Sequence, residues 1–209
     1  MKLYDCATAP SPRRVRIYLA EKGIDVPKTE IDLRSGEHFK EPFASLNDRC
    51  DVPFLELDDG TGIGEPEAIC RYFEAENPEP PMFGRTAKEQ GLVSMWNHRI
   101  EMEGFMAIAE ALRNKSSGFK GRALTGKVGY EQIPELAERG QKRTEVFFSN
   151  LNDLLSDRDF ITGDAYTFAD ITAQAAVDFA AWLKIAPGDD QPHLKRWHEA
   201  VSARPSAKA

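Results

Sequence analysis

The sequence predicts a two-domain protein, with an α/β domain at the N-terminus and an all-α domain after it. Two observations carry this prediction. Strand-like and helix-like patterns alternate up to about residue 77, in the order βαβαββα. Beyond the proline-dense residues 77–82, which cannot continue a helix, every pattern is helical. We therefore expect an α/β domain over residues 1–77, a linker over residues 78–85 and an all-α domain over residues 86–209.

The first half of the α/β domain has the pattern of a βαβ unit. A strand is expected at residues 2–5 and a second at residues 29–33. The helix between them begins near Arg13, with Ser11 as its expected cap and Pro12 in its first turn. Because the connection contains a helix, the two strands should be parallel. A weaker helical pattern follows over residues 38–46.

The second half of this domain is contained in residues 51–73. Val52-Pro53 leads into an apolar run, Asp58-Asp59-Gly60 is a hairpin turn signal, and a helix begins at Pro66. The proline before the strand has two interpretations: a turn device, or a cis-proline that presents the preceding backbone to a peptide-like ligand. Spacing alone leaves both open.

The all-α domain has four helical patterns and one Gly- and Lys-rich loop. The helices are expected at residues 86–114, 133–156, 167–183 and 192–204, with the loop at residues 116–130. Thr167 and Asp170 have the spacing of an N-cap pair that starts a buried helix. We expect Asp170 to be structural rather than catalytic.

Composition excludes several classes of function. The chain has 209 residues and a net charge of −7, and its basic residues are scattered, so no nucleic-acid partner is expected. No apolar run approaches membrane-spanning length. The three cysteines are widely spaced and form no metal-ligand pattern, which is typical of a reducing cytoplasm. We expect a cytoplasmic protein with no membrane partner and no metal.

Two motifs resemble one known family. The order Val-Pro, strand, turn, strand and Glu65-x-x-Ala-Ile resembles the second half of the thioredoxin-like domain in the cytosolic glutathione transferase superfamily. Gly163 followed by Thr167-x-x-Asp170 resembles an element of the C-terminal domain of the same family. The resemblance covers essentially the whole chain, and it implies a glutathione-binding protein with glutathione as co-substrate.

The resemblance implies specific contacts to glutathione. The backbone of Val52, before a cis Pro53, would pair with the cysteinyl unit, and Glu65 would hold the γ-glutamyl end. The family's usual serine after this acid is Pro66 here, which offers neither a hydroxyl nor an N–H. The next amide, that of Glu67, is its expected substitute because helix N-terminal N–H groups bind carboxylates.

The glycyl end of glutathione also departs from the family pattern. His38 matches a position that reaches the glycyl carboxylate in theta-like members; the alternative is a surface histidine. Asp51 stands where relatives usually carry a lysine, and an acid there would repel that carboxylate.

The thiol must be activated at the start of the first helix, where hydroxyl groups and the helix dipole favour a thiolate. Ala9 occupies the position where many members carry a catalytic serine or cysteine. Ser11 is the nearest hydroxyl, and its loop is similar to the Thr-Pro-Asn loop of bacterial Nu-type members. We expect Ser11 to be catalytic and to bind glutathione; the alternative is a helix cap only.

An electrophile pocket is implied between the domains, and the same residue types at helical spacing are also typical of a core. The candidates are Trp96, Arg99, Met102, Phe105, Met106 and Phe119.

The resemblance implies a glutathione S-transferase that conjugates the thiolate to an electrophilic small molecule, a detoxification chemistry. Two alternatives remain: a glutathione-dependent disulfide or peroxide reductase, and a catalytically silent binding module, which Ala9, Asp51 and Pro66 favour. The resemblance and the sequence Arg71-Tyr72-Phe73 predict a two-fold homodimer.

Overall fold

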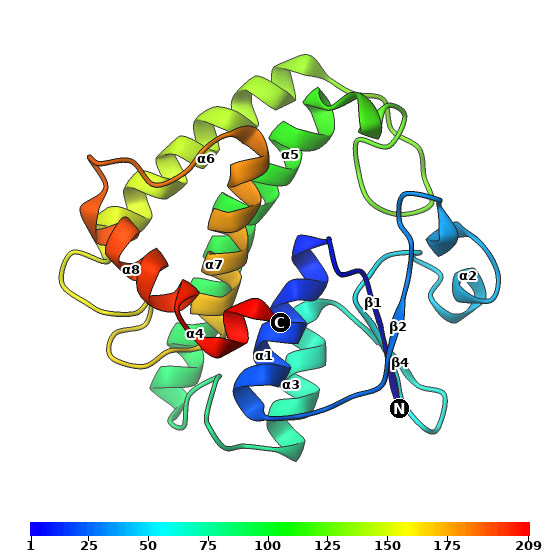
Figure 1. The fold of residues 1–209 in the computed structure, drawn as a ribbon, viewed down its shortest axis with the longest axis horizontal. Coiled ribbons are helices and arrows are strands. Elements are labelled where there is room, and N and C mark those ends of the chain that lie inside the picture. The colour runs from blue at the N-terminus through cyan, green and yellow to red at the C-terminus, as the bar shows by residue number, and fades with distance from the viewer.

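The computed structural model describes residues 1–209, in two domains that lie side by side (Figure 1). The N-terminal domain has a four-stranded sheet in the order β2-β1-β3-β4, with β1 and β2 parallel and the other neighbours antiparallel. Its elements are β1 (Lys2–Asp5), α1 (Pro10–Lys22), β2 (Lys28–Glu30), the 3-10 turn η1 (Glu37–Phe39), α2 (Phe43–Leu46), β3 (Phe54–Glu56), β4 (Gly62–Gly64) and α3 (Pro66–Glu76). The expected βαβαββα order is confirmed.

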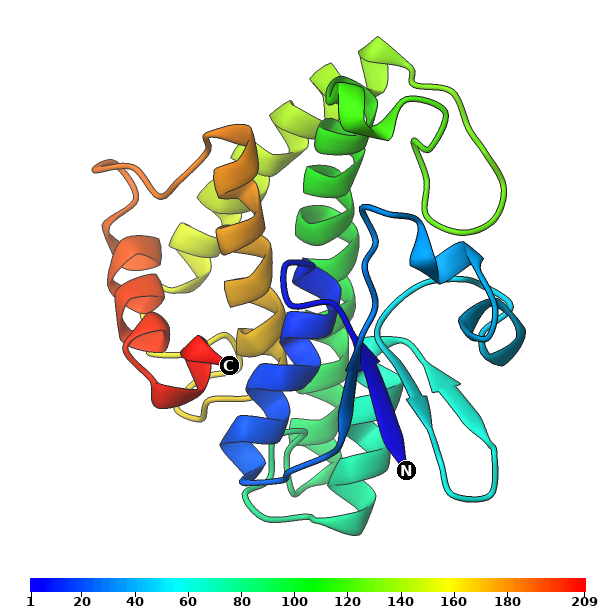
Figure 2. The ribbon, with the colours of Figure 1, turned by 45° about the vertical axis from the view of Figure 1, so that its right-hand side comes forward.

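The second domain is entirely helical, as expected. Its elements are α4 (Ala87–Arg99), the π-helical turn η2 (Ile100–Phe105), α5 (Met106–Lys115), η3 (Ser117–Phe119), α6 (Pro134–Leu154), α7 (Phe168–Ala180), η4 (Ala181–Leu183), α8 (Pro192–Ser202) and η5 (Pro205–Lys208). Helices α4 and α5 join through η2 into one rod, beside which α6 and α7 run (Figure 2). None of the helices combines the length and the apolar composition that crossing a membrane requires.

The π-helical turn interrupts what the sequence predicts as one regular helix. Gly104 lies in this turn against Phe147 of α6, so close that a Cβ at Gly104 would be 2.4 Å from the phenyl ring. Arg143 of α6 donates a hydrogen bond to the Met102 carbonyl in the same turn, at 2.6 Å. Helix α6 therefore packs directly against the irregular turn through Phe147 and Arg143.

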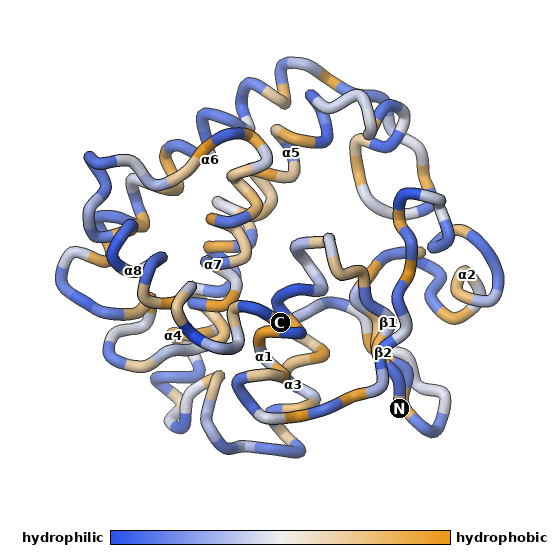
Figure 3. Tube along the Cα trace, in the orientation of Figure 1, coloured by the Kyte–Doolittle hydropathy of each residue, from blue (hydrophilic) through white to orange (hydrophobic).

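The two domains share a hydrophobic core. Phe168 and Ile171 of α7 belong to the apolar cluster that fills the N-terminal domain, and Tyr18 of α1 meets Phe168 edge to face at 6.1 Å. Met82 and Phe83, from the expected linker, are buried in the same cluster. Helix α7 is apolar along most of its length (Figure 3) and is almost completely buried. This shared core places α1 firmly against the second domain.

The N-cap pair at the start of α7 is confirmed. The Asp170 carboxylate accepts hydrogen bonds from the Thr167 N–H and hydroxyl, from the Ile161 N–H and from the Trp197 indole. Burial raises the pKa of Asp170 to about 6, although these donors oppose the shift. All of its partners are structural, and it lies in the core rather than at the cleft described below.

Two local expectations were wrong. Helix α1 begins at Pro10, its N-cap is Ala9, and no side chain caps it, so Ser11 is not the cap. The reason is that Pro10 fits the first helical position, where no N–H is required. Strand β2 covers Lys28–Glu30 rather than residues 29–33, because its partner β1 ends at Asp5, opposite Glu30.

Two glycine substitutions test the closeness of α5 and α6. A Cβ at Gly140 would lie 2.6 Å from the Ala111 nitrogen and 2.7 Å from the Ala107 oxygen, both backbone atoms. We expect Gly140→Ala to lower the free energy of unfolding by about 1–3 kcal/mol. Gly91→Ala, in α4 with nothing within 4 Å of the added methyl, should raise it by about 0.5–1 kcal/mol. Urea unfolding measures both, and equal stabilities would contradict the close helix contact.

Candidate active site

A cleft of about 620 Å³ lies between the two domains. The N-terminal domain contributes the loop before α1, the loop after β2 and the loop before β3; the second domain contributes α5, the following loop and the end of α7 with η4. Its lining residues used below are Thr8, Ala9, Pro10, Ser11, Arg34, His38, Phe39, Cys50, Asp51, Val52, Phe105, Ala109, Leu112, Arg113, Phe119, Arg122, Gly126, Phe179 and Trp182.

The start of α1 points a small set of hydrogen-bond donors at this cleft. Pro10 and Pro12 have no N–H, and the Ala9 N–H is bonded to the Cys6 carbonyl at 3.0 Å. The Ser11 N–H has no acceptor. Ser11 therefore offers an N–H and a hydroxyl at the positive end of the helix dipole, an arrangement that favours an anion.

Arg14, one turn into α1, orients the Ser11 hydroxyl. Its guanidinium donates to Ser11 Oγ at 3.1 Å and to Glu101 at 2.5 Å, and it stacks on the Phe105 ring at 4.6 Å. Arg14 is 4% exposed, so its charge acts through little water. Because Ser11 Oγ accepts from Arg14, its own proton is free to be donated into the cleft.

Val52 lies in the cleft wall, and the bond to Pro53 is cis, as expected. Asn47 holds the loop before it, donating to the backbone carbonyl of Asp51 at 2.8 Å and to its carboxylate at 3.1 Å. The Arg49 Nε lies 3.2 Å from the other carboxylate oxygen. The Asp51 carboxylate, which would otherwise repel a ligand carboxylate, is thus already bound by Asn47 and Arg49.

His38 is buried in the cleft wall without a hydrogen-bond partner. Its side chain is in contact with the Phe39 ring, and its Nδ1 is a buried polar atom that nothing satisfies. Burial lowers the pKa of His38, and the positive charges of Arg122 and Arg113 lower it further. Nδ1 itself is enclosed by protein atoms, so His38 borders the cleft through other atoms of its side chain.

The start of α3 lies outside the residues that line the cleft. Glu65 has a positive φ of 66° and a side chain that is mostly exposed. Pro66 is buried in the first helical position, and the N–H groups of Glu67 and Ala68 have no acceptor. The Glu67 carboxylate is occupied, accepting from Asn97 of α4 at 2.6 Å and from Arg71 at 2.7 Å.

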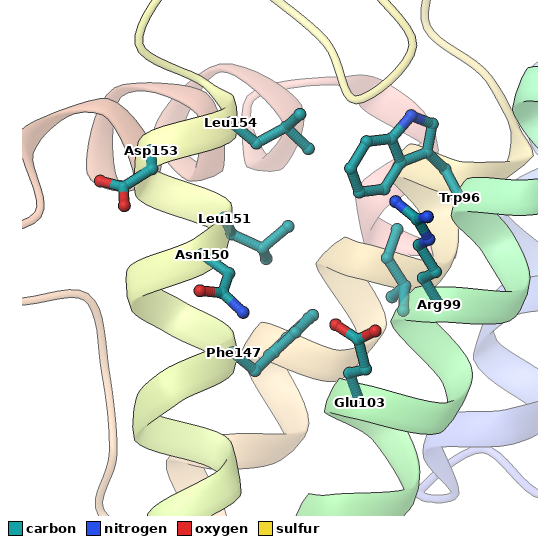
Figure 4. A pocket seen from close by; sticks show the side chains of 9 residues that line it. Trp96, Arg99, Glu103, Phe147, Asn150, Leu151, Asp153 and Leu154 are labelled. Carbon is teal, nitrogen blue, oxygen red and sulfur yellow. The ribbon is translucent and has the colours of Figure 1, made fainter.

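The six candidate electrophile residues are divided among three places. Phe105 and Phe119 line the cleft. Met102 and Met106 are about half exposed and do not line it. Trp96 and Arg99 line a second pocket of about 350 Å³, which is formed with α6 (Figure 4).

Sequence reasoning missed several residues of the cleft. Ala109 and Leu112 follow Phe105 at i+4 and i+7, so helical spacing from one correct residue would have found them. Phe179, Trp182, Arg113 and Arg122 have no such signal, because only tertiary packing brings them to the cleft.

Comparisons with known proteins agree over the whole chain. A family model described as "Glutathione S-transferase, N-terminal domain" matches residues 8–76, and one described as "Glutathione S-transferase, C-terminal domain" matches residues 112–205. The chain is 34% identical to Glutathione S-transferase 2 of Saccharomyces cerevisiae over 210 residues, covering 100% of this chain and 88% of the relative.

Solved structures agree with this result. The chain resembles Gtt2 from Saccharomyces cerevisiae with a TM-score of 0.91 and 34% identity, covering 100% of this chain and 99% of that one. It also resembles a glutathione S-transferase domain-containing protein from Marinobacter aquaeolei, with a TM-score of 0.90, 35% identity and 99% of each chain covered.

The electrostatic coupling of His38 to the loop arginines is directly testable. We expect the pKa of His38 to lie below its ordinary value and to rise in Arg122→Gln, because removing a nearby positive charge favours protonation. Proton NMR titration measures it, with His38→Gln to assign the resonance. Lys120→Gln, on the same loop, is the control and should leave the pKa unchanged. A His38 pKa that is the same in wild type and in Arg122→Gln would contradict the geometry of the cleft.

Proposed function

Since the chain belongs to the glutathione S-transferase family, we propose that it joins the glutathione thiol to an electrophilic small molecule in the cleft between its domains. The observation that carries this proposal is the start of α1, where Ser11 presents a free N–H and an Arg14-oriented hydroxyl. Both groups stabilise a thiolate more than a thiol, so bound glutathione becomes a nucleophile near neutral pH.

The rest of glutathione extends from this point along the N-terminal domain. The backbone of Val52 pairs with the cysteinyl unit, as its position beside the cis Pro53 supports. The γ-glutamyl end lies at the start of α3, where Glu65 meets the amine and the free N–H groups of Glu67 and Ala68 meet the carboxylate. His38 faces the glycyl end.

The electrophile occupies the part of the cleft in the second domain. Phe105, Phe119, Phe179 and Trp182 supply aromatic surface there, and they favour an apolar or aromatic acceptor. Trp96 and Arg99 are left out of this proposal because they line the other pocket, and Met102 and Met106 because they line neither.

We place this chemistry in the cytoplasm, in a two-fold homodimer. Three unpaired, buried cysteines suit a reducing compartment. Within Arg71-Tyr72-Phe73, the side chain of Phe73 is buried in its own domain. Arg71 and Tyr72 are therefore the residues of this segment that would contact the partner subunit.

One pair of assays tests the function against its alternatives. The protein should bind a glutathione-affinity column and conjugate a chlorinated aromatic substrate. Reduction of a mixed disulfide without conjugation would indicate a reductase instead. Absence of both reactions from a folded protein would indicate a silent binding module.

Removing the Ser11 hydroxyl should raise the pKa of bound glutathione. A hydrogen bond to a charged group contributes about 1.5–3 kcal/mol, which corresponds to about one to two pKa units. We expect Ser11→Ala to shift the thiolate absorbance curve to higher pH by that amount, with most turnover recovered in alkali. Thr8→Val, which removes the other hydroxyl of this loop, should leave the curve in place. Identical curves for Ser11→Ala and wild type would assign the stabilisation to the N–H and helix dipole.

The homodimer is tested by its mass. Sedimentation equilibrium at micromolar concentration should give twice the 23.4 kDa of one chain. A charge reversal, Arg71→Glu, should weaken the dimer, and Arg34→Glu, in the cleft, should not. A protein that remains monomeric under these conditions would rule out the dimer.

A further inference from the structure

The cleft holds an excess of unpaired positive charge. Arg34, Arg113 and Arg122 line it, and none has a carboxylate within ion-pair distance. The only acid in the lining is Asp51, and its carboxylate is bound by Asn47 and Arg49. Unpaired arginines in a partly closed cleft are a site for an anion, since guanidinium groups bind carboxylates through two parallel hydrogen bonds.

Arg113, near the end of α5, and Arg122, in the loop that follows, are both held in place by backbone carbonyls of the segment after α5. Arg113 donates to the carbonyls of Ala123, Arg122 and Leu124, at 3.2, 2.7 and 2.8 Å, and it stacks on Phe119. Arg122 donates to the Gly118 carbonyl at 3.1 Å. These bonds use one side of each guanidinium and neutralise no charge. Both groups are therefore pre-positioned and still carry donors for a ligand.

The loop that carries Arg122, and whose carbonyls hold Arg113, reaches the N-terminal domain. Gly126 lies beside the Arg49 carbonyl, where an added Cβ would be in ordinary van der Waals contact, 3.7 Å from the oxygen. The loop between α5 and α6 hangs beside the segment around α2 in both ribbon views (Figures 1 and 2). It thus faces His38 across the cleft, and the loop arginines are close enough to depress the His38 pKa.

We propose that Arg113 and Arg122 join His38 in binding the carboxylate at the glycyl end of glutathione, so that residues of both domains form this subsite. The inference rests on the proposed glutathione binding. Glutathione supplies a carboxylate at this end, and His38, Arg113 and Arg122 line the same cleft with no carboxylate of the protein paired to either arginine. The two arginines compensate for Asp51. Relatives usually carry a lysine at position 51, and here Arg113 and Arg122 supply positive charge in its place.

A rival ligand for the same charges is an acidic electrophile. Arg113 follows Leu112 on α5, and Leu112 lines the cleft beside the aromatic groups assigned to the electrophile. Proximity to His38 favours the glycyl carboxylate, since His38 lies on the N-terminal domain, where glutathione binds. The experiment below separates the two ligands.

The test compares glutathione with its glycyl monoethyl ester, in which this carboxylate is replaced by an uncharged ethyl ester. Calorimetry at fixed pH and salt gives both dissociation constants. Wild type should bind the ester about tenfold or more weakly. Arg122→Gln should bind free glutathione about tenfold more weakly and lose most of the preference for it. Arg122→Lys should keep part of that preference, and Lys120→Gln, on the same loop, should keep all of it.

Each other outcome is informative. If folded Arg122→Gln keeps the wild-type ratio between the dissociation constants of the ester and of free glutathione, the inference is overturned. This holds whether or not the affinity for both peptides falls. If Arg122→Gln raises the KM only for an acidic electrophile, the arginines bind the second substrate and the inference is wrong. Wild type that binds neither peptide would refute the proposed function itself. Arg113→Gln serves as a second variant only if circular dichroism shows it folded, since it loses three loop bonds.

Discussion

The packing of α1 between the two domains sets the geometry of the cleft. Helix α1 touches α3 in its own domain and α7 in the other. Its first turn is tied to α7 through Arg13 and Asp178, and its last turn to the C-terminal segment through Glu21 and Arg204 at 2.7 Å. Both ends of α1 are thus anchored in the second domain. These contacts set the position of the thiol site opposite the aromatic surface of the cleft.

Arg14 connects the start of α1 to the second domain through a single side chain. It is a buried charge that contacts the Ser11 hydroxyl, the Glu101 carboxylate and the Phe105 ring. Removing one partner of a buried pair costs about 3–5 kcal/mol, because the remaining charge stays desolvated. The same guanidinium thus contributes to the domain contact, to the orientation of the hydroxyl and to the positive potential where an anionic sulfur would lie.

The sequence predicted elements whose signals are local and missed features that depend on packing. The βαβαββα order of elements along the chain, the turn at residues 58–60 and the Thr167–Asp170 cap follow from short motifs with fixed geometry. The extent of β2 depends on where β1 ends, and the π-helical turn depends on Phe147 from another helix, so neither has a local signal. In the candidate site, Ser11, His38 and Val52 line one cleft, and their roles toward glutathione stay predictions. The sequence did not predict that Arg113 and Arg122 line the cleft, because only tertiary packing brings these residues there.

The π-helical turn also acts as a register device in the rod of α4 and α5. Successive residues of an α-helix are rotated by about 100°, so one residue more or less in Ile100–Phe105 would turn everything beyond it by that angle. Trp96 and Arg99 precede the turn and face one pocket, whereas Ala109, Leu112 and Arg113 follow it and face the other. A family member that lost or gained a single residue here would present a different face of α5 to its substrate. A change of length in this turn would thus alter the surface that α5 presents to a substrate without any substitution among the residues that line the cleft.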